Sequence, residues 1–260
     1  TGKRITSFQS HRGCPHRCRF CLDGCHKVLY PNPTPVRKRD VYDLLDEVAM
    51  CVTSYSLDFF KFNDPTWNVN KDYCKEICRV KINRDIKTPF FANLHANAVD
   101  DEMFALMAEA GCREVGLGVE SGSEKILGQI GKATTLDSIR RARMLARKNF
   151  INVRGYFILG MPGETEEDLL LTECFAEELQ LEEYGFAMLC PYPGTDFYVQ
   201  NEAQLEDTDW SVTDEYHNTF WHTDTVSNER LREVQLHLIE KFKSRLTQHQ
   251  RVVEAPGRAV

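Results

Sequence analysis

The chain has 260 residues, 42% of them hydrophobic and 27% charged, and its formal net charge is −7. This size and composition predict a soluble protein with one sizeable core, and the acidic balance argues against a nucleic-acid partner, whose binding sites are normally basic. The longest apolar runs fall far short of the ~18 to 20 residues of a membrane span, so none is expected. Ten cysteines without a visible signal peptide indicate free thiols in a cytoplasmic protein.

Short β-rich apolar segments alternate with segments of helical periodicity over the first 200 residues. Strands are expected at 5–8, 57–63, 89–94, 113–119, 153–159 and 184–190. Helices are expected at 40–51 and 101–110, and after the N-cap residues Thr135 and Thr165. This alternation predicts an α/β protein with a parallel sheet, either open or curled toward a barrel, although six units are two short of a closed eightfold barrel.

The alternation stops at about residue 200. An acidic stretch with several aromatic residues follows, and then an amphipathic helix is expected at about 228–247. We therefore expect a catalytic core over 1–200 and a C-terminal cap or helical extension over 201–260.

Cys14, Cys18 and Cys21 form a Cys-x-x-x-Cys-x-x-Cys run directly after the first expected strand. Iron–sulfur clusters are normally closed by four thiolates, so a cluster held by these three would keep one iron open to a reactant. The ligand count therefore favours catalysis over simple electron storage. In a parallel α/β fold, this loop lies at the carboxyl ends of the strands, where ligands bind.

Two other interpretations of these cysteines remain open at this point. A structural zinc site needs a fourth ligand, and several neighbouring residues are close enough in sequence to supply it: His11, His16, Cys25 and His26. A closed iron–sulfur cluster would use Cys25 as its fourth thiolate. Either alternative would make the chain a non-enzymatic binding or electron-transfer protein.

The run RGCPHRCRFC, with Phe20 before the third cysteine, resembles the radical S-adenosylmethionine (radical SAM) superfamily. The resemblance implies a partial (β/α)6 TIM-like barrel and a 4Fe–4S cluster on Cys14, Cys18 and Cys21, whose open iron chelates S-adenosylmethionine (SAM). It further implies reductive cleavage of SAM to a 5′-deoxyadenosyl radical, with electrons from a donor such as a flavodoxin or a ferredoxin.

Later motifs extend this resemblance through most of 5–200 and imply residues that hold SAM. Asp64 follows the second strand, where relatives carry an acid near the methionine ammonium. Glu120 and Ser121 belong to a G-x-E-S-G element expected to meet the methionine or ribose part. Arg154, on the fifth strand, is expected to pair with the methionine carboxylate. Tyr156 stands where the family carries a glycine, which is a departure from the pattern.

Two turns complete the resemblance. The turn G-M-P-G-E-T contains Glu164, which is expected to shape the turn and the start of the next helix. The turn P-Y-P-G-T at 191–195 resembles cobalamin-binding members, the magnesium-protoporphyrin ester cyclase and cobalamin-dependent methyltransferase group. This implies methyl transfer or oxidative cyclisation of a small-molecule or peptide substrate. Cobalamin would bind through a domain not in this chain, because the family's Asp-x-His-x-x-Gly loop does not occur in these residues.

The other cysteines and histidines carry weaker signals. Cys74 and Cys78 share one helix face but have no partner motif, so we expect them to be buried as small hydrophobic residues. His95, after the third strand, is a candidate for the mouth of the barrel, although a lone histidine is more often satisfied structurally.

Overall fold

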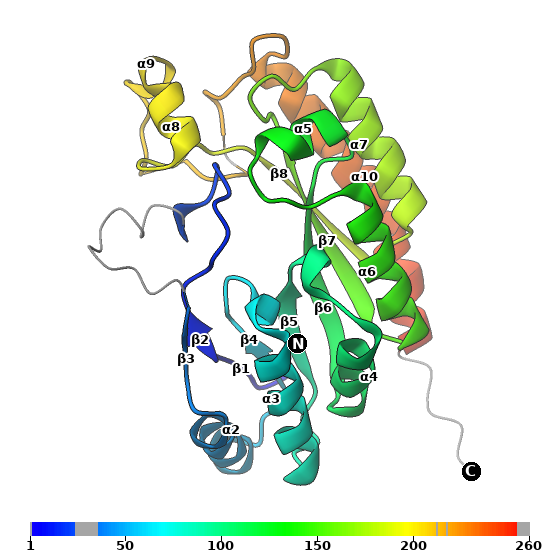
Figure 1. The fold of residues 1–260 in the computed structure, drawn as a ribbon. Coiled ribbons are helices and arrows are strands. Elements are labelled where there is room, and N and C mark those ends of the chain that lie inside the picture. The colour runs from blue at the N-terminus through cyan, green and yellow to red at the C-terminus, as the bar shows by residue number, and fades with distance from the viewer. Residues whose placement is uncertain (1, 24–35, 212, 217, 254–260) are drawn as a thin grey trace.

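The computed structural model describes residues 2–23, 36–211, 213–216 and 218–253. Its main sheet has six parallel strands in the order β1-β4-β5-β6-β7-β8 (Figure 1). The bounds are β1 Ile5–Phe8, β4 Phe59–Phe62, β5 Phe90–Leu94, β6 Cys112–Glu120, β7 Asn152–Leu159 and β8 Glu183–Met188. A second, antiparallel sheet pairs β2 His11–Arg12 with β3 Arg37–Lys38.

Helices follow the strands in the expected alternation. They are α2 Val41–Tyr55, α3 Lys71–Asn83, α4 Asp101–Glu109, α5 Glu124–Gln129, α6 Leu136–Lys148, α7 Glu166–Leu179, α8 Asp196–Gln200, α9 Glu202–Leu205 and α10 Asn228–Val253, with short 3₁₀ turns at Trp67–Val69 and Ala96–Ala98. Thr135 and Thr165 cap α6 and α7, each as half of a capping box, as predicted.

The sheet confirms the predicted partial barrel. Each strand lies within two residues of its predicted bounds, and β1 and β8 form opposite edges of the sheet. The β2–β3 pair was not predicted, because two-residue strands carry no periodicity.

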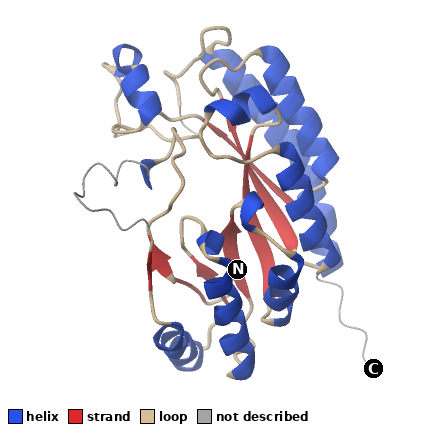
Figure 2. Cartoon of the chain, in the orientation of Figure 1, coloured by secondary structure: helices blue, strands red, loops and turns tan. Residues whose placement is uncertain are grey.

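The two faces of the main sheet have different surroundings. One face packs against helices: Phe60 and Phe62 are fully buried, and the Phe186 ring packs at a tilt on Phe242 of α10, with centroids 5.5 Å apart. Figure 2 shows the helices gathered along this side. On the other face, which we call the inner face, Lys61 is exposed and Tyr156 is 36% exposed. Parallel sheets are normally covered on both faces, so the inner face is the one available to a ligand.

The C-terminal extension packs on the same core. Gln235 of α10 donates to the Phe186 carbonyl at 2.9 Å, and the Trp221 indole donates to the Gly160 carbonyl at 2.6 Å. The predicted division at residue 200 remains a prediction. Within the described residues, no helix combines the length and the apolar character that spanning a membrane requires.

Gly122 and Gly128 provide a matched pair of expected stability changes. A Cβ at Gly122 would lie 2.4 Å from the Leu171 carbonyl oxygen, where the turn after β6 crosses α7, whereas a Cβ at Gly128 of α5 would meet nothing within 4 Å. We expect Gly122→Ala to lower the free energy of unfolding by about 1–3 kcal/mol, and Gly128→Ala to raise it by up to ~1 kcal/mol through helix propensity. Urea denaturation measures both, and equal effects would contradict the packing shown here.

Candidate functional site

The cysteine loop crosses the carboxyl ends of the strands. Its Arg19 amide donates to the Ile130 carbonyl beyond β6 at 3.0 Å, and the Arg19 carbonyl accepts from the Phe197 amide beyond β8 at 3.3 Å. The His16 ring stacks on His95 beyond β5, with centroids 4.0 Å apart. These contacts hold the loop against three strand ends, at the edge where ligands of such folds bind.

The three thiols lie in this loop as free, partly exposed groups. The Cys21 amide donates to the Cys18 carbonyl at 3.0 Å, which forms a tight turn, and the Cys14 sulfur lies 3.8 Å from the Thr66 hydroxyl. Burial raises the pKa of Cys18 to about 12, against the opposing effect of the nearby Lys132 ammonium. Burial also raises the pKa of Cys21, so both of these thiols stay protonated until metal binding releases their protons.

The donor set fits an iron–sulfur cluster. Among the described residues, no three His, Cys, Asp or Glu side chains converge on one point as the ligands of a single metal ion do. A cubane cluster binds each thiolate to a different iron. Three thiols of one loop can therefore bind the cluster without all pointing at a single metal ion.

Two of the proposed fourth ligands for a zinc or closed site have other neighbours in the described residues. His11 is buried with its Nδ1 atom 3.4 Å from an Asp64 oxygen, and His16 stacks on His95. Cys25 and His26 lie outside the described residues.

Glu120 and Lys132 form a buried ion pair at the end of β6, next to the cysteine loop. Glu120 is 5% exposed and has φ +65°, a left-handed backbone conformation that is uncommon for a residue other than glycine. The Lys132 ammonium also donates to the Gly118 carbonyl at 2.8 Å. A Cβ at Gly118 would overlap that ammonium, so a larger residue here would displace the Lys132 side chain from its present position. Strained backbone and buried charge together mark a functional site.

Lys132 was not predicted from the sequence. It follows α5 in a segment without a motif, and only the buried carboxylate of Glu120 signalled that a cation was needed. Ser121, by contrast, is directed away from the loop, because its hydroxyl lies 3.1 Å from that of Thr172 and accepts from the Ser123 amide at 3.1 Å. Phe20 is half-buried and packs on the core, where it anchors the loop.

Asp64 supports the start of the cysteine loop. It is 1% exposed, and its carboxylate accepts from the Ser10 amide at 2.9 Å, the His11 amide at 2.8 Å and the Ser10 hydroxyl at 3.0 Å. These hydrogen bonds tie the corner between β1 and β2 to the end of β4. These carboxylate oxygens therefore hold the start of the loop, and the predicted contact of Asp64 with the methionine ammonium stays a prediction.

Arg154 lies apart from the other predicted site residues, and its predicted contact with the methionine carboxylate stays a prediction. It is in register with Gly116, four positions before Glu120 on the neighbouring strand, and so lies toward the amino ends of the strands. Its guanidinium pairs with Glu183 and, at 3.1 Å, with Glu114. Two carboxylates already compensate this cation, and it does not reach the cysteine loop.

Tyr156 covers the middle of the inner face. A Cβ at Gly116 would lie 2.8 Å from its ring, and a Cβ at Gly185 would lie 3.4 Å from it, so the ring extends over glycines of both neighbouring strands. The Asn93 Oδ1 atom, beside the same Gly116, is buried and has no hydrogen-bond partner. An aromatic ring next to an unsatisfied acceptor suits a ligand that has an apolar surface and a hydrogen-bond donor.

Glu164 shapes its turn, as predicted. One carboxylate oxygen accepts from the Gly160 amide at 2.5 Å and the Met161 amide at 3.2 Å, while the other is buried without a partner. Burial raises the pKa of this carboxyl to about 8.

A raised carboxyl pKa makes stability depend on pH. Between pH ~4.5 and about 8, the folded state keeps a proton on Glu164 that the unfolded state has lost, so the free energy of unfolding falls by up to ~1.4 kcal/mol per pH unit as pH rises. We expect Glu164→Gln to lack this contribution, so that wild type loses stability relative to the variant from pH 5 to 8. Denaturant titrations at several pH values test this, and a pH-independent difference would contradict it.

Comparison with known proteins identifies the class to which this geometry belongs. Residues 8–173 match the family model described as "Radical SAM superfamily". The chain therefore belongs to the radical SAM superfamily. Members are enzymes that use a 4Fe–4S cluster and SAM, so the expected enzyme class and these two cofactors are confirmed, and the non-enzymatic alternatives are set aside.

Particular relatives include methyltransferases and a cyclase. The chain is 31% identical over 185 residues to "Uncharacterized methyltransferase PH0819" of Pyrococcus horikoshii, covering 71% of this chain and 39% of that protein. It is 28% identical over 206 residues to the anaerobic magnesium-protoporphyrin IX monomethyl ester cyclase of Rubrivivax gelatinosus, covering 78% and 36%. The chain thus spans less than half the length of either relative.

A solved structure shares the fold. The radical SAM methyltransferase TsrM from Kitasatospora setae, solved with cobalamin and a [4Fe-4S] cluster bound, superposes with a TM-score of 0.68 at 22% identity, covering 77% of this chain and 37% of that one. At this identity the likeness supports the partial-barrel fold alone.

Proposed function

We propose that this chain is the catalytic core of an enzyme that cleaves SAM for methyl transfer or oxidative cyclisation of an organic substrate. The observation that carries the proposal is the three-cysteine loop held across the strand ends next to the buried Lys132–Glu120 pair. Cys14, Cys18 and Cys21 would hold the cluster, which when bound supplies the electron that cleaves SAM to a 5′-deoxyadenosyl radical.

Lys132 and Glu120 would hold the amino-acid end of SAM. That end is a zwitterion, so its carboxylate suits the Lys132 ammonium, and its ammonium or the ribose hydroxyls suit the Glu120 carboxylate. The two side chains already compensate each other at this edge, and SAM would replace one ion pair by two. Both charges are already held at this edge, so binding a zwitterion requires only that the two side chains exchange partners.

The substrate would lie on the inner face. The exposed part of the Tyr156 ring and the unsatisfied Asn93 oxygen lie on this face, below the strand ends where the cysteine loop is held. A substrate held there would cover the one face of the sheet that helices leave open. It would also exclude water from the radical's path.

Relatives support the two reaction types but do not choose between them. Their names include a methyltransferase and a cyclase, and a structural neighbour was solved with cobalamin bound. We propose that residues 1–200 form the catalytic core and 201–260 its cap. Any cobalamin would bind outside these residues, and electrons would come from a donor such as a flavodoxin or ferredoxin.

The test of this function needs no substrate. The protein is reconstituted with iron and sulfide without oxygen, reduced with dithionite and mixed with SAM, and 5′-deoxyadenosine is sought by mass spectrometry. We expect its appearance in proportion to cluster content. A protein with a full cluster that forms no 5′-deoxyadenosine would instead indicate a closed cluster.

A further inference from the structure

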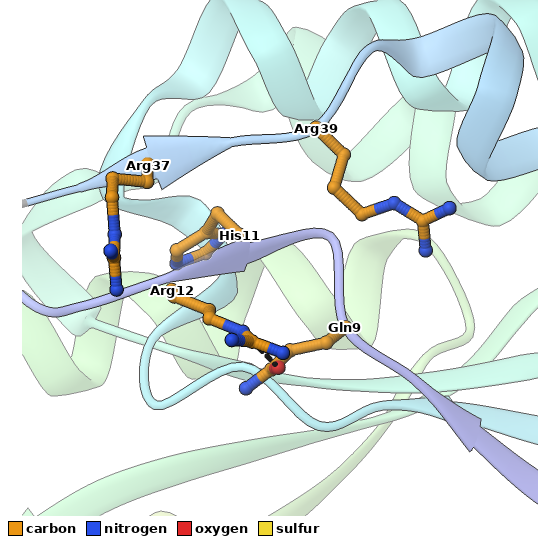
Figure 3. A pocket seen from close by; sticks show the side chains of 5 residues that line it. All are labelled: Gln9, His11, Arg12, Arg37 and Arg39. Carbon is orange, nitrogen blue, oxygen red and sulfur yellow. Dashed lines mark hydrogen bonds between the residues drawn. The ribbon is translucent and has the colours of Figure 1, made fainter.

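A pocket of about 300 Å³ lies beside the start of the cysteine loop. Figure 3 shows the side chains that line it: Gln9, His11, Arg12, Arg37 and Arg39. These residues belong to the β1–β2 corner and to the segment at and just after β3, and none of them is acidic. In a chain with a net charge of −7, a pocket lined by three arginines is an unusual concentration of positive charge.

The strand register places like charges opposite each other. Arg12 of β2 pairs directly with Arg37 of β3, and His11 pairs with Lys38. Like charges at directly opposed positions destabilise an antiparallel pair. These strands are only two residues long, so few ladder hydrogen bonds offset the repulsion.

The two opposed arginines lack acidic partners. Arg39 pairs with Glu47 at 2.6 Å, and in Figure 3 its side chain extends away from the other two. Among the residues that the structure describes, Arg12 donates only to the Gln9 side chain, at 3.2 Å. Arg37 has no ion pair or hydrogen bond from its side chain within the described ranges, and the sequence of 24–35 contains no Asp or Glu that could supply one.

His11 lines the pocket with a buried ring. Its Nδ1 atom lies near Asp64 and the Ser10 hydroxyl, and burial lowers the pKa of this imidazole. The positive charge that the pocket offers to a ligand therefore comes from its arginines.

We propose that this pocket binds a phosphoryl group, with Arg12 and Arg37 as its main contacts. A phosphate carries a charge of about −1.5 to −2 and three acceptor oxygens, enough to bridge two guanidinium groups. Guanidinium also matches phosphate geometry with paired hydrogen bonds. Arg12 precedes Cys14 by two residues, so a phosphorylated molecule held here would lie beside the catalytic loop. The site is separate from the Lys132–Glu120 pair.

The experiment measures phosphate binding without turnover. Inorganic phosphate and phenyl phosphate are titrated into the reconstituted protein at constant ionic strength by isothermal titration calorimetry, with sodium sulfate as a competing anion. We expect saturable binding that Arg37→Gln weakens by about tenfold or more, because a charged hydrogen-bonding partner is lost. Tighter binding of phenyl phosphate would identify an organic phosphate as the occupant, and equal binding would identify free phosphate.

The matched control is Arg147→Gln, an exposed arginine of α6 remote in sequence from the pocket. It should bind phosphate like wild type. Equal weakening in both variants, no saturation, or sulfate binding as tightly as phosphate would overturn the proposal, because each indicates general anion attraction. Arg37 is exposed, so its variant should keep the fold and the wild-type iron content. Phosphate binding by the wild type and by the variants does not depend on SAM cleavage. A negative result for this pocket would therefore be distinguishable from a failure of the proposed function.

Discussion

Replacing Cys18 by alanine should abolish the 4Fe–4S cluster and, with it, 5′-deoxyadenosine formation. The proposed site has three protein thiolates and no spare, so removing one leaves an incomplete ligand set. Burial raises the pKa of the Cys18 thiol to about 12, and alanine at this position leaves no donor in its place. Iron and sulfide analysis, with the visible absorption of the reconstituted protein, measures the cluster directly.

Two other cysteine variants make this result interpretable. Cys174→Ala changes an exposed thiol on α7 and should retain the full cluster. Cys25→Ala tests a fourth ligand, and an open-site cluster should survive it. Loss of iron from the Cys25 variant together with the Cys18 variant would show a closed four-thiolate site and would overturn the ligand assignment.

Replacing Lys132 by methionine should weaken SAM binding by about 10- to 100-fold. A hydrogen bond to a charged group contributes about 1.5–3 kcal/mol, and each 1.4 kcal/mol is a factor of ten in affinity. The same change leaves the Glu120 carboxylate buried without its cation, which costs about 3–5 kcal/mol of folding stability. Equilibrium dialysis with SAM, on samples matched for iron content, measures the first effect, and thermal denaturation measures the second.

A double variant separates binding from stability. Lys132→Met with Glu120→Gln removes both buried charges, so much of the lost stability should return while SAM binding stays weak. Lys148→Met, on the exposed face of α6 where it pairs with Asp101, should leave both quantities unchanged. SAM affinity that recovered together with stability would show that Lys132 acts only through folding.

Local patterns predicted the fold of this chain well. The burial of alternate residues marks β4 and β7, and the threonine caps mark the starts of α6 and α7, because these signals lie within a few consecutive residues. The β2–β3 pair and its opposed arginines had no such signal. That pairing joins Arg12 to Arg37 across 24 intervening residues, and only the folded chain shows it.

The site residues were less predictable because their roles depend on partners. Asp64 and Arg154 matched positions expected to bind SAM, yet one ties down the cysteine loop and the other pairs with Glu114 and Glu183. Lys132 matched no motif of the sequence, yet it forms the buried ion pair with Glu120. The residues next to a charged side chain in the sequence do not indicate which distant charge it will pair with in the fold.

The sequence by itself determined the chemistry of the ligands and the order of the elements. The spacing of Cys14, Cys18 and Cys21 predicts a three-thiolate donor set, and the alternating patterns predict the parallel strands between helices that the structure has. Only the tertiary structure decided which charges meet: Glu120 with Lys132, Arg154 with two glutamates, Arg12 with Arg37. The physical reason is that parallel strand register and loop packing join residues far apart in the chain, and electrostatic energy depends on those distances.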